Sequence, residues 1–419
     1  MKILWVVNLV LPKVAHLIGE KEIPFGGWVT NMIDQLSKNS SLEIGVVMRA
    51  PIQETISKEI EGVTYFLIPQ NKNDKFDIYQ KDCEETLNAF QPTLLHVEGS
   101  ESAHARRFLR TWEGNNVVSM QGILKGYEQY EYGGLSLGRL FKSSSLKSTI
   151  TMLTMMLNKR LNFKARLPIE VQTIEMAKNI LGRTHWDRAH SYFINPSAPY
   201  YECSRILRKG FYTHEWDMGN IIRHRVFIGN SAQARKGAHF VLEAIALLKK
   251  EYPEIELVIV GEKPYPKSKF DWKSKIGYKS YLIEQIKELN LVENVKFLGV
   301  QNENEMINTI CRSHVFIMSS IIENSPNTLG EAMILGVPCI SSYMGGVSDM
   351  AEDGKEVLFY RDNDPVLLAM RIKQIFESDE LATQLSINAK QRATVTHNPE
   401  KNYKDLLDVY STIISTAKS

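Results

Sequence analysis

Two glutamates, Glu323 and Glu331, stand eight residues apart around the predicted start of a helix. Ser325 is a residue type that is preferred at a helix N-cap, and Pro326 suits the first helical position. Free backbone N–H groups and the helix dipole favour a bound anion at such a helix start. Two carboxylates this close first suggest an acid and a base, although surface acids near a helix start would have the same spacing. The pair becomes informative only through the residues around it.

The elements around this helix are two short apolar runs. One run ends at Met318, and the other covers residues 337–341. The helix between these two runs is expected to end at Gly336 and Pro338, because glycine accepts a left-handed conformation and proline cannot continue a helix. The expected order is strand, loop, helix and strand, and open α/β sheets bind phosphorylated ligands at loops of this kind. The loop before the helix is therefore the first candidate binding site.

The rest of the chain repeats the alternation of strands and helices. Short apolar runs separated by amphipathic stretches occur in both halves, and this pattern predicts parallel sheets. We expect strands over residues 3–7, 44–48, 63–68, 94–97, 117–119, 225–228, 257–260, 295–297 and 315–318. The expected fold class is α/β, with one Rossmann-like sheet in each half.

Length, charge and cysteine content narrow the class of protein. With 419 residues the chain is too long for one ordinary hydrophobic core, so two domains are expected. A net charge of +2 does not indicate binding to nucleic acid, and four widely spaced cysteines predict neither a disulfide framework nor a zinc site. No apolar run is long enough for a transmembrane helix, and we expect the apolar N-terminus to be a buried strand rather than a secretion signal.

One segment, residues 133–169, departs from this pattern. It holds seven basic residues and no acidic residue, whereas the rest of the chain has 43 basic and 48 acidic residues. Residues 150–157 within it are apolar and rich in methionine. A basic helix with an apolar face can lie on an anionic membrane surface. The alternative is a helix that packs inside the protein and exposes a solvated basic face.

The residues around the two glutamates carry a family resemblance. The string reads Glu323-Asn-Ser-Pro-Asn-Thr-Leu-Gly-Glu331-Ala-Met, followed by Gly336-Val-Pro338 and Gly345-Gly346. It resembles the donor-site signature of retaining GT-B glycosyltransferases of the family 4 type, within glycosyl transferases group 1. The resemblance is strong over residues 223–361 and weak in the N-terminal half. It implies two Rossmann-like domains facing each other across a cleft. The N-terminal domain would consist of residues 1–205 and 398–419, and the C-terminal domain of residues 206–397.

The resemblance assigns the sugar donor to the C-terminal domain. Lys236 would pair with the β-phosphate of a nucleotide-diphospho-sugar, because a lysine is a suitable point charge for a leaving diphosphate. Glu323 would orient the transferred sugar through its hydroxyls, and Glu331 would accept hydrogen bonds from the ribose. The other implied donor residues are Arg235, Asn230, Ser325, Asn327, Thr328, Leu329, Gly261 and Phe297. The family usually has an arginine at the place of Asn230, so Arg235 or Arg223 would have to supply the second cation.

The resemblance places the acceptor, or part of the diphosphate, at the N-terminal domain. Gly26-Gly27 after the first strand resembles the family's glycine loop, where backbone N–H groups can approach a ligand closely. Family members often have a histidine where this chain has Gln121, and an amide can bind a sugar hydroxyl but cannot exchange a proton. His96, at the end of a predicted strand, is either a further site residue or structural. Arg183 is the remaining candidate.

The implied activity is transfer of a sugar, with retention at the anomeric carbon, from a UDP- or GDP-linked donor to a hydroxyl of a glycan or lipid-linked acceptor. Such reactions build cell-surface polysaccharides and glycolipids. Lys236, the N–H groups at Asn327 and Thr328 and the helix dipole would stabilise the leaving diphosphate, so we expect no cofactor and no metal ion. We expect the protein in the cytoplasm, at the inner face of the cell membrane. The alternatives are a sugar phosphorylase or synthase on the same fold, and a non-catalytic partner subunit.

Overall fold

The computed structural model describes residues 1–20, 26–74, 76–135, 146–265 and 277–416. The chain forms two compact units. Unit 1 consists of Met1–Gly126, Phe163–Arg208 and His397–Ser419, and unit 2 consists of Tyr127–Asn162 and Lys209–Thr396. Residues 127–162 therefore belong to unit 2, although the segments directly before and after them in sequence belong to unit 1.

Unit 1 is built on an eight-stranded sheet with the order β3-β4-β2-β1-β5-β6-β7-β8. Its strands are β1 (Lys2–Val7), β2 (Glu43–Ala50), β3 (Ile56–Ile60), β4 (Val63–Pro69), β5 (Leu94–Glu98), β6 (Asn115–Ser119), β7 (Ile180–Gly182) and β8 (Tyr200–Glu202). The five strands expected in this half are confirmed. All neighbouring strands pair in parallel except β3 and β4.

The antiparallel β3 is the exception to the predicted parallel pattern. It joins β4 through the two-residue turn Glu61-Gly62, in which both residues have positive φ values of 51° and 76°. Two such residues form the tight turn whose twist suits a β-hairpin. The strand has an exposed centre and pairs on one side only, so its sequence lacks the apolar pattern that reveals a buried strand.

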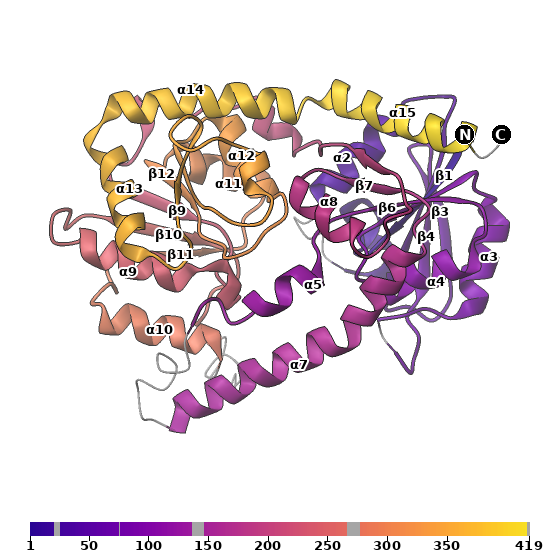
Figure 1. Cartoon of the computed structure of the whole chain (residues 1–419), viewed down its shortest axis with the longest axis horizontal. Coiled ribbons are helices and arrows are strands. Elements are labelled where there is room, and N and C mark those ends of the chain that lie inside the picture. Colours follow the sequence, from indigo (N-terminus) through magenta and orange to yellow (C-terminus); the bar gives the residue numbers. More distant parts are fainter. Residues whose placement is uncertain (21–25, 75, 136–145, 266–276, 417–419) are drawn as a thin grey trace. The chain divides into compact units, whose positions relative to one another are not determined.

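Helices cover both faces of the unit 1 sheet. One face packs against α2 (Gly27–Leu36) and the C-terminal α15 (Pro399–Thr416), which lie against each other (Figure 1). The other face packs against α3 (Gln80–Phe90) and α4 (Ala103–Thr111). The remaining helices are α1 (Pro12–Ala15), α5 (Leu124–Tyr127), α7 (Leu146–Glu175) and α8 (His185–Tyr192), of which α5 and α7 contribute to both units.

Unit 2 is built on a six-stranded parallel sheet with the order β11-β10-β9-β12-β13-β14. Its strands are β9 (Arg225–Ile228), β10 (Glu256–Val260), β11 (Val295–Gly299), β12 (Val315–Met318), β13 (Cys339–Ser342) and β14 (Val357–Tyr360). Its helices are α9 (Ala238–Leu248), α10 (Tyr278–Glu288), α11 (Glu303–Cys311), α12 (Asn327–Leu335), α13 (Pro365–Glu377) and α14 (Asp379–Thr396) (Figure 1). Short 3-10 turns add His16–Ile18, Glu128–Tyr130, Lys209–Tyr212, Met218–Asn220, Ala234–Lys236 and Val347–Asp349.

Each sheet has one point where the order of its strands reverses. In unit 1 this point lies between β1 and β5, and Val7 is in register with Glu98 there. In unit 2 it lies between β9 and β12, and Ile228 is in register with Ile317. Loops that follow such a pair of strands diverge and leave room for a ligand at the carboxyl ends. The loops that carry Lys236 and Glu323 follow β9 and β12.

No helix among the described residues is both long enough and apolar enough to cross a membrane. Arg139 and Lys142 of the basic segment lie outside the described residues.

Candidate functional site

In unit 2, Lys236 and Glu323 form an ion pair between Nζ and Oε1. Lys236 ends the 3-10 turn that follows β9, and Glu323 lies in the loop that follows β12. Ser320 Oγ donates to the same carboxylate oxygen at 3.1 Å, and Arg235 Nη1 lies 4.0 Å from it. The fold therefore brings two cations to the first predicted carboxylate, although Lys236 and Glu323 are 87 residues apart in sequence.

The two loops are held to each other by their backbones. Ile321 N–H donates to the Arg235 carbonyl at 2.8 Å, and Ser319 Oγ donates to the Lys236 carbonyl at 2.7 Å. Gly237 has a φ of 71°, and a Cβ at this residue would lie 1.9 Å from the Ser319 carbonyl oxygen. Only glycine fits such a close backbone approach at positive φ. The glycine after Lys236 thus allows the lysine loop to reach the Glu323 loop.

The charges around Glu323 keep this carboxyl group ionised. Burial raises its pKa, but Lys236 and Arg235 lower it by more, so the pKa of Glu323 lies below its ordinary value of 4.5. Its side chain is 13% exposed. An ionised carboxylate accepts hydrogen bonds and donates none, so Glu323 suits contact with the hydroxyl groups of a sugar.

Helix α12 begins beside this ion pair in sequence but one residue later than predicted. It starts at Asn327, and Pro326 occupies the N-cap position without a side-chain cap, so the N-cap prediction for Ser325 is wrong. Pro326 has an extended backbone, which places it before the helix. Asn327 and Thr328 are half-buried at the first two helical positions. Their N–H groups have no partner within the helix, as at every helix start.

Two further predicted donor residues lie inside α12. Leu329 is fully buried and belongs to the core of unit 2, which leaves only its backbone for a ligand. Glu331 lies in the second turn and is 4% exposed. The helix ends at Gly336, which has a φ of 80°, as predicted for a glycine C-cap.

Asn230, Gly261 and Phe297 lie on three neighbouring strands or the loops after them. Asn230 Oδ1 accepts from Ala232 N–H at 2.8 Å and so closes a small turn. A Cβ at Gly261 would lie 3.3 Å from this same Asn230 side chain, so the two residues are adjacent. Phe297 in β11 is half-buried and packs edge-to-face on Tyr265, with the ring centroids 5.6 Å apart.

In unit 1 the glycine loop precedes α2. Gly26 is the N-cap of this helix with a φ of 85°, a conformation that favours glycine. Gly27 is the first helical residue, and a Cβ there would lie 2.7 Å from Cγ of Arg208. The loop therefore allows a close approach, which in this structure is made by an arginine side chain.

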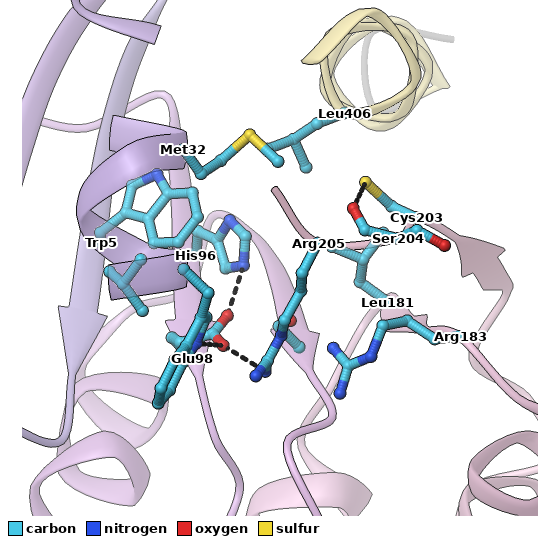
Figure 2. A pocket seen from close by; sticks show the side chains of 13 residues that line it. Trp5, Met32, His96, Glu98, Leu181, Arg183, Cys203, Ser204, Arg205 and Leu406 are labelled. Atoms are coloured by element: carbon cyan, nitrogen blue, oxygen red, sulfur yellow. Dashed lines mark hydrogen bonds and ion pairs between the residues drawn. The ribbon is translucent and has the colours of Figure 1, made fainter. Parts of the chain in front are cut away.

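The reversal point of the unit 1 sheet holds a buried polar cluster around Glu98 (Figure 2). Glu98 is 3% exposed and accepts from Arg205 Nη2 at 2.7 Å, from Gln121 Nε2 at 3.2 Å and from Trp28 Nε1 at 3.3 Å. Burial raises the pKa of Glu98, but Arg205, His96 and Arg183 together lower it by more, to about 2. The cluster lines a cavity of about 30 Å³, which has room for roughly one or two waters. Gln121 is thus tied to an ionised carboxylate.

The two other candidates of unit 1 differ in exposure. His96 is 1% exposed, stacks near Trp5 with centroids 3.8 Å apart, and contacts Tyr410 Oη through Nδ1. Burial lowers the pKa of His96, so the ring is neutral, and this environment fits the structural alternative. Arg183 is half-buried, and its Nη2 donates to the Met120 carbonyl at 2.9 Å. It lines the same cavity as Arg205 (Figure 2).

Several residues of both clusters were not predicted from sequence. They are Glu98, Trp28 and Arg205 in unit 1, and in unit 2 Ser320 together with Tyr127 and Glu131, which both contact Arg235. Glu98 ends a buried strand and precedes Gly99, whose φ is 94°, and an acid followed by glycine at a strand end is a signal that could have been used. Arg205 has no such local signal, because it lies 107 residues from its partner.

Across the part of the chain that the structure describes, no group of three or more histidine, cysteine, aspartate or glutamate side chains could hold a metal ion.

Residues 225–392 match the sequence model of the family described as Glycosyl transferases group 1. This segment contains Lys236, Glu323 and Glu331, and the match confirms the resemblance to glycosyl transferases group 1. The chain is 26% identical to D-inositol 3-phosphate glycosyltransferase of Corynebacterium urealyticum over 189 aligned residues. This alignment covers 45% of this chain and 42% of that protein. The alignments thus span less than half the length of the first curated relatives, 42% and 48%.

Solved structures are similar over the whole chain. Sucrose-phosphate synthase from Thermosynechococcus elongatus has a TM-score of 0.72 and 13% identity, and the match covers 99% of this chain and 100% of that one. HepE from Anabaena in complex with UDP-glucose has a TM-score of 0.67 and 13% identity, with 98% and 100% covered. Together with the two parallel-sheet units, these likenesses confirm the predicted GT-B fold.

Proposed function

We propose that the protein is a metal-independent, retaining glycosyltransferase that moves a sugar from a nucleotide-diphospho-sugar to an acceptor hydroxyl. The observation that carries this proposal is the convergence of Lys236, Arg235 and Glu323 where β9 and β12 end, inside the segment matched to group 1. Cations beside an ionised carboxylate suit a ligand that joins a diphosphate to a sugar. The diphosphate needs positive charge, and the sugar offers hydroxyl donors.

Breaking the bond between the sugar and the diphosphate leaves negative charge on the diphosphate. Lys236, Arg235 and the first N–H groups of α12 would stabilise this charge, a task that a metal ion has in other enzymes. Glu323 would accept hydrogen bonds from the sugar and hold its anomeric carbon in place. Glu331 would bind the ribose hydroxyls through its two oxygens.

Retention of configuration requires a covalent intermediate or attack from the face of the leaving group. We favour front-face attack, because Glu323 would already be engaged with sugar hydroxyls. The acceptor oxygen forms a bond to the anomeric carbon as the bond to the diphosphate breaks. The acceptor proton passes to an oxygen of the departing diphosphate, so the leaving group is also the base.

The donor would carry uridine or guanosine, and the acceptor would be a glycan or a lipid-linked hydroxyl of a cell-surface polysaccharide or glycolipid. The similarity to HepE in complex with UDP-glucose supports uridine. The acceptor would bind at the carboxyl ends of the unit 1 strands, where Gly26, Gln121 and Arg183 lie.

A nucleotide screen tests this proposal. We expect UDP or GDP, but not the free nucleosides, to raise the melting temperature by several degrees, because a ligand at a hundred times its Kd stabilises by about 2.7 kcal/mol. The matching sugar nucleotide should then be consumed, with an α-linked product from an α-linked donor. Consumption only with inorganic phosphate would indicate the phosphorylase. No stabilisation by any nucleoside diphosphate would contradict the proposal and favour the non-catalytic subunit.

We further propose that α7 brings the protein to the inner face of the cell membrane. Ile150, Leu153, Leu157 and Leu161 are spaced along one side of the helix and are between 39% and 63% exposed. The segment from residue 133 to residue 169 has no acidic residue to repel anionic lipids. Exposed leucines beside basic residues suit the interface of an anionic bilayer.

Sedimentation with vesicles tests the membrane proposal. We expect the protein to sediment at low salt with phosphatidylserine vesicles and to stay in solution with phosphatidylcholine alone. The double variant Leu157→Glu with Leu161→Glu should stay in solution with both. Leu247→Glu is the matched control, because Leu247 is a leucine of α9 that is 51% exposed, and it should sediment like the wild type. A wild-type protein that does not sediment would disprove the membrane contact.

A further inference from the structure

Residues 127–135 belong to unit 2, unlike the residues that precede them, and they contact the loop that carries Arg235 and Lys236. Gly133 packs so closely on this loop that a Cβ would lie 2.2 Å from the Ala234 carbonyl oxygen. The carbonyl of Gly133 also lies 2.9 Å from His239 Nε2 at the start of α9. The end of this segment at Gly133 thus packs beside Arg235 and Lys236, and Tyr127 lies at its other end.

Tyr127 touches both loops of the candidate donor site. Its ring is the platform for Arg235, whose Cζ lies 5.4 Å from the ring centroid. Its hydroxyl oxygen accepts a hydrogen bond of 3.1 Å from the N–H of Asn324, the residue directly after Glu323. The side chain is 8% exposed, so protein rather than water surrounds it. One tyrosine therefore sets the position of a cation and of the loop that carries Glu323.

Three contacts fix the guanidinium of Arg235. Besides the ring of Tyr127, Glu131 Oε2 lies 3.9 Å from Nε and Glu323 Oε1 lies 4.0 Å from Nη1. Both ion-pair distances are longer than hydrogen bonds. The guanidinium is therefore attracted to these two carboxylates without donating a hydrogen bond to either of them at these distances. Arg235 is 20% exposed and can present N–H groups to a ligand.

The other arginine that could replace the family's missing cation is engaged elsewhere. Arg223 forms a two-pronged ion pair with Asp379, with distances of 2.5 and 2.6 Å, and its side chain is 49% exposed. Asn230, at the place of the usual arginine, is uncharged and uses Oδ1 within its own loop. Of these three residues, only Arg235 is a cation close to Glu323.

We propose that Arg235 is the second cation for the donor diphosphate and that Tyr127 is its positioning residue, an inference that rests on the proposed function. The aromatic ring attracts the guanidinium and holds it over its face, while the hydroxyl accepts the hydrogen bond that joins the ring to the Glu323 loop. The arginine thus stands next to Lys236 in sequence instead of at the end of β9. A segment from the N-terminal half of the chain supplies the support that this new location needs.

Affinity for nucleoside diphosphates tests the inference. Binding of UDP, GDP and ADP, and of the corresponding nucleosides, is measured by calorimetry. We expect Arg235→Ala to lower the affinity for the nucleoside diphosphate that binds the wild type by at least about tenfold. The affinity for the corresponding nucleoside should stay unchanged. Tyr127→Leu should reproduce this selective loss. Tyr127→Phe keeps the ring and should bind within about threefold of the wild type. Arg223→Ala is the matched control and should bind like the wild type.

The double variant Tyr127→Leu with Arg235→Ala separates positioning from general structural support. If Tyr127 acts through Arg235, the double variant binds the diphosphate no more weakly than Arg235→Ala. Additive losses, or wild-type affinity in Arg235→Ala, would overturn the inference. If Tyr127→Leu does not fold, the comparison of Arg235→Ala with Arg223→Ala still decides the role of the arginine. A wild type that binds no nucleoside diphosphate would instead refute the proposed function.

Discussion

Replacing Lys236 by alanine is expected to slow sugar transfer at least about a hundredfold while the protein stays folded. The loss of one preorganised group that stabilises developing charge commonly costs this much or more. Lys236 is 25% exposed and sits in a loop, so its removal opens no core cavity. The variant should lose affinity for the diphosphate as well, because the same charge acts on the bound donor and on the leaving group.

The lysine also determines the protonation of its partner. After burial, Lys236 is the main influence on the pKa of Glu323 and holds it below 4.5. Without the lysine, burial is opposed only by Arg235 and Ser320, so the pKa should rise. The remaining activity of Lys236→Ala should therefore fall at a higher pH than that of the wild type when the solution is made acidic. Glu323→Ala should lose at least as much activity but cannot show this shift.

Initial rates of transfer at saturating acceptor measure both effects. Lys373→Ala is the matched control, because Lys373 forms an ion pair with Glu251 on unit 2 and is 29% exposed, similar to Lys236. It should transfer sugar like the wild type. Circular dichroism and melting curves show whether each variant is folded. Wild-type rates in either Lys236→Ala or Glu323→Ala would refute the site assignment.

Replacing Arg205 by alanine is expected to destabilise unit 1 by about 3–5 kcal/mol near neutral pH. The guanidinium is the cation bound to Glu98, and the two side chains are 12% and 4% exposed. Removal of one partner deprives a buried charge of its main compensation, which is among the most costly single substitutions. Trp28 and Gln121 would still donate to Glu98 without carrying a charge. His96 Nε2 would still lie 3.7 Å from the carboxylate, but burial lowers the pKa of this ring and keeps it neutral.

This loss should depend on pH, with a sign that follows from Glu98. In the wild type the pKa of Glu98 is about 2, below its ordinary value of 4.5, so ionised Glu98 stabilises the fold above pH 4.5 and this contribution is lost as the pH falls towards 2. In Arg205→Ala, burial is less opposed and should raise the pKa. The variant should then regain stability relative to the wild type as the solution is acidified. The gap between them is largest at neutral pH.

Hydrogen exchange of the β5 amides measures this effect locally, since a chain with two units need not unfold in one step. Arg188→Ala is the control, because this arginine of unit 1 is 58% exposed and lies 3.9 Å from its partner Glu202, and surface pairs of this kind contribute little. Adding Glu98→Gln to Arg205→Ala should restore part of the stability, because an amide carries no charge. A loss below about 1 kcal/mol in Arg205→Ala would contradict the assignment of a buried charge pair.

The fold was largely predictable because its elements have strong local signals. Buried parallel strands such as β9 and β12 are continuous apolar runs, and both appear at the expected residues. The strand β3 was missed because only one of its edges is paired and its centre is exposed, which leaves no apolar pattern. The predicted start of α12 was one residue too early. Serine followed by proline is a favoured pair for the N-cap and the first helical position, but here Pro326 has an extended backbone and is itself the N-cap.

The site was predictable where one loop holds its residues. Glu323, Glu331 and the first residues of α12 belong to a single string, and Lys236 belongs to a second one. The choice between Arg235 and Arg223 was open, since both are basic residues near β9. The structure separates them, because one packs on Tyr127 and the other pairs with Asp379.

Residue types and local spacing were enough to indicate alternating strands and helices, a capped helix and a lysine before a glycine, because these features depend on near neighbours in the chain. Arg205, the cation beside Glu98, and Tyr127, the ring beside Arg235, each lie more than a hundred residues from their partner in sequence. Their contacts arise only when parallel strands bring distant loops to one edge of a sheet and packing removes water from around the charges. The tertiary structure therefore decided which arginine stands beside Glu323, that His96 is buried, and that the buried Glu98 stays ionised.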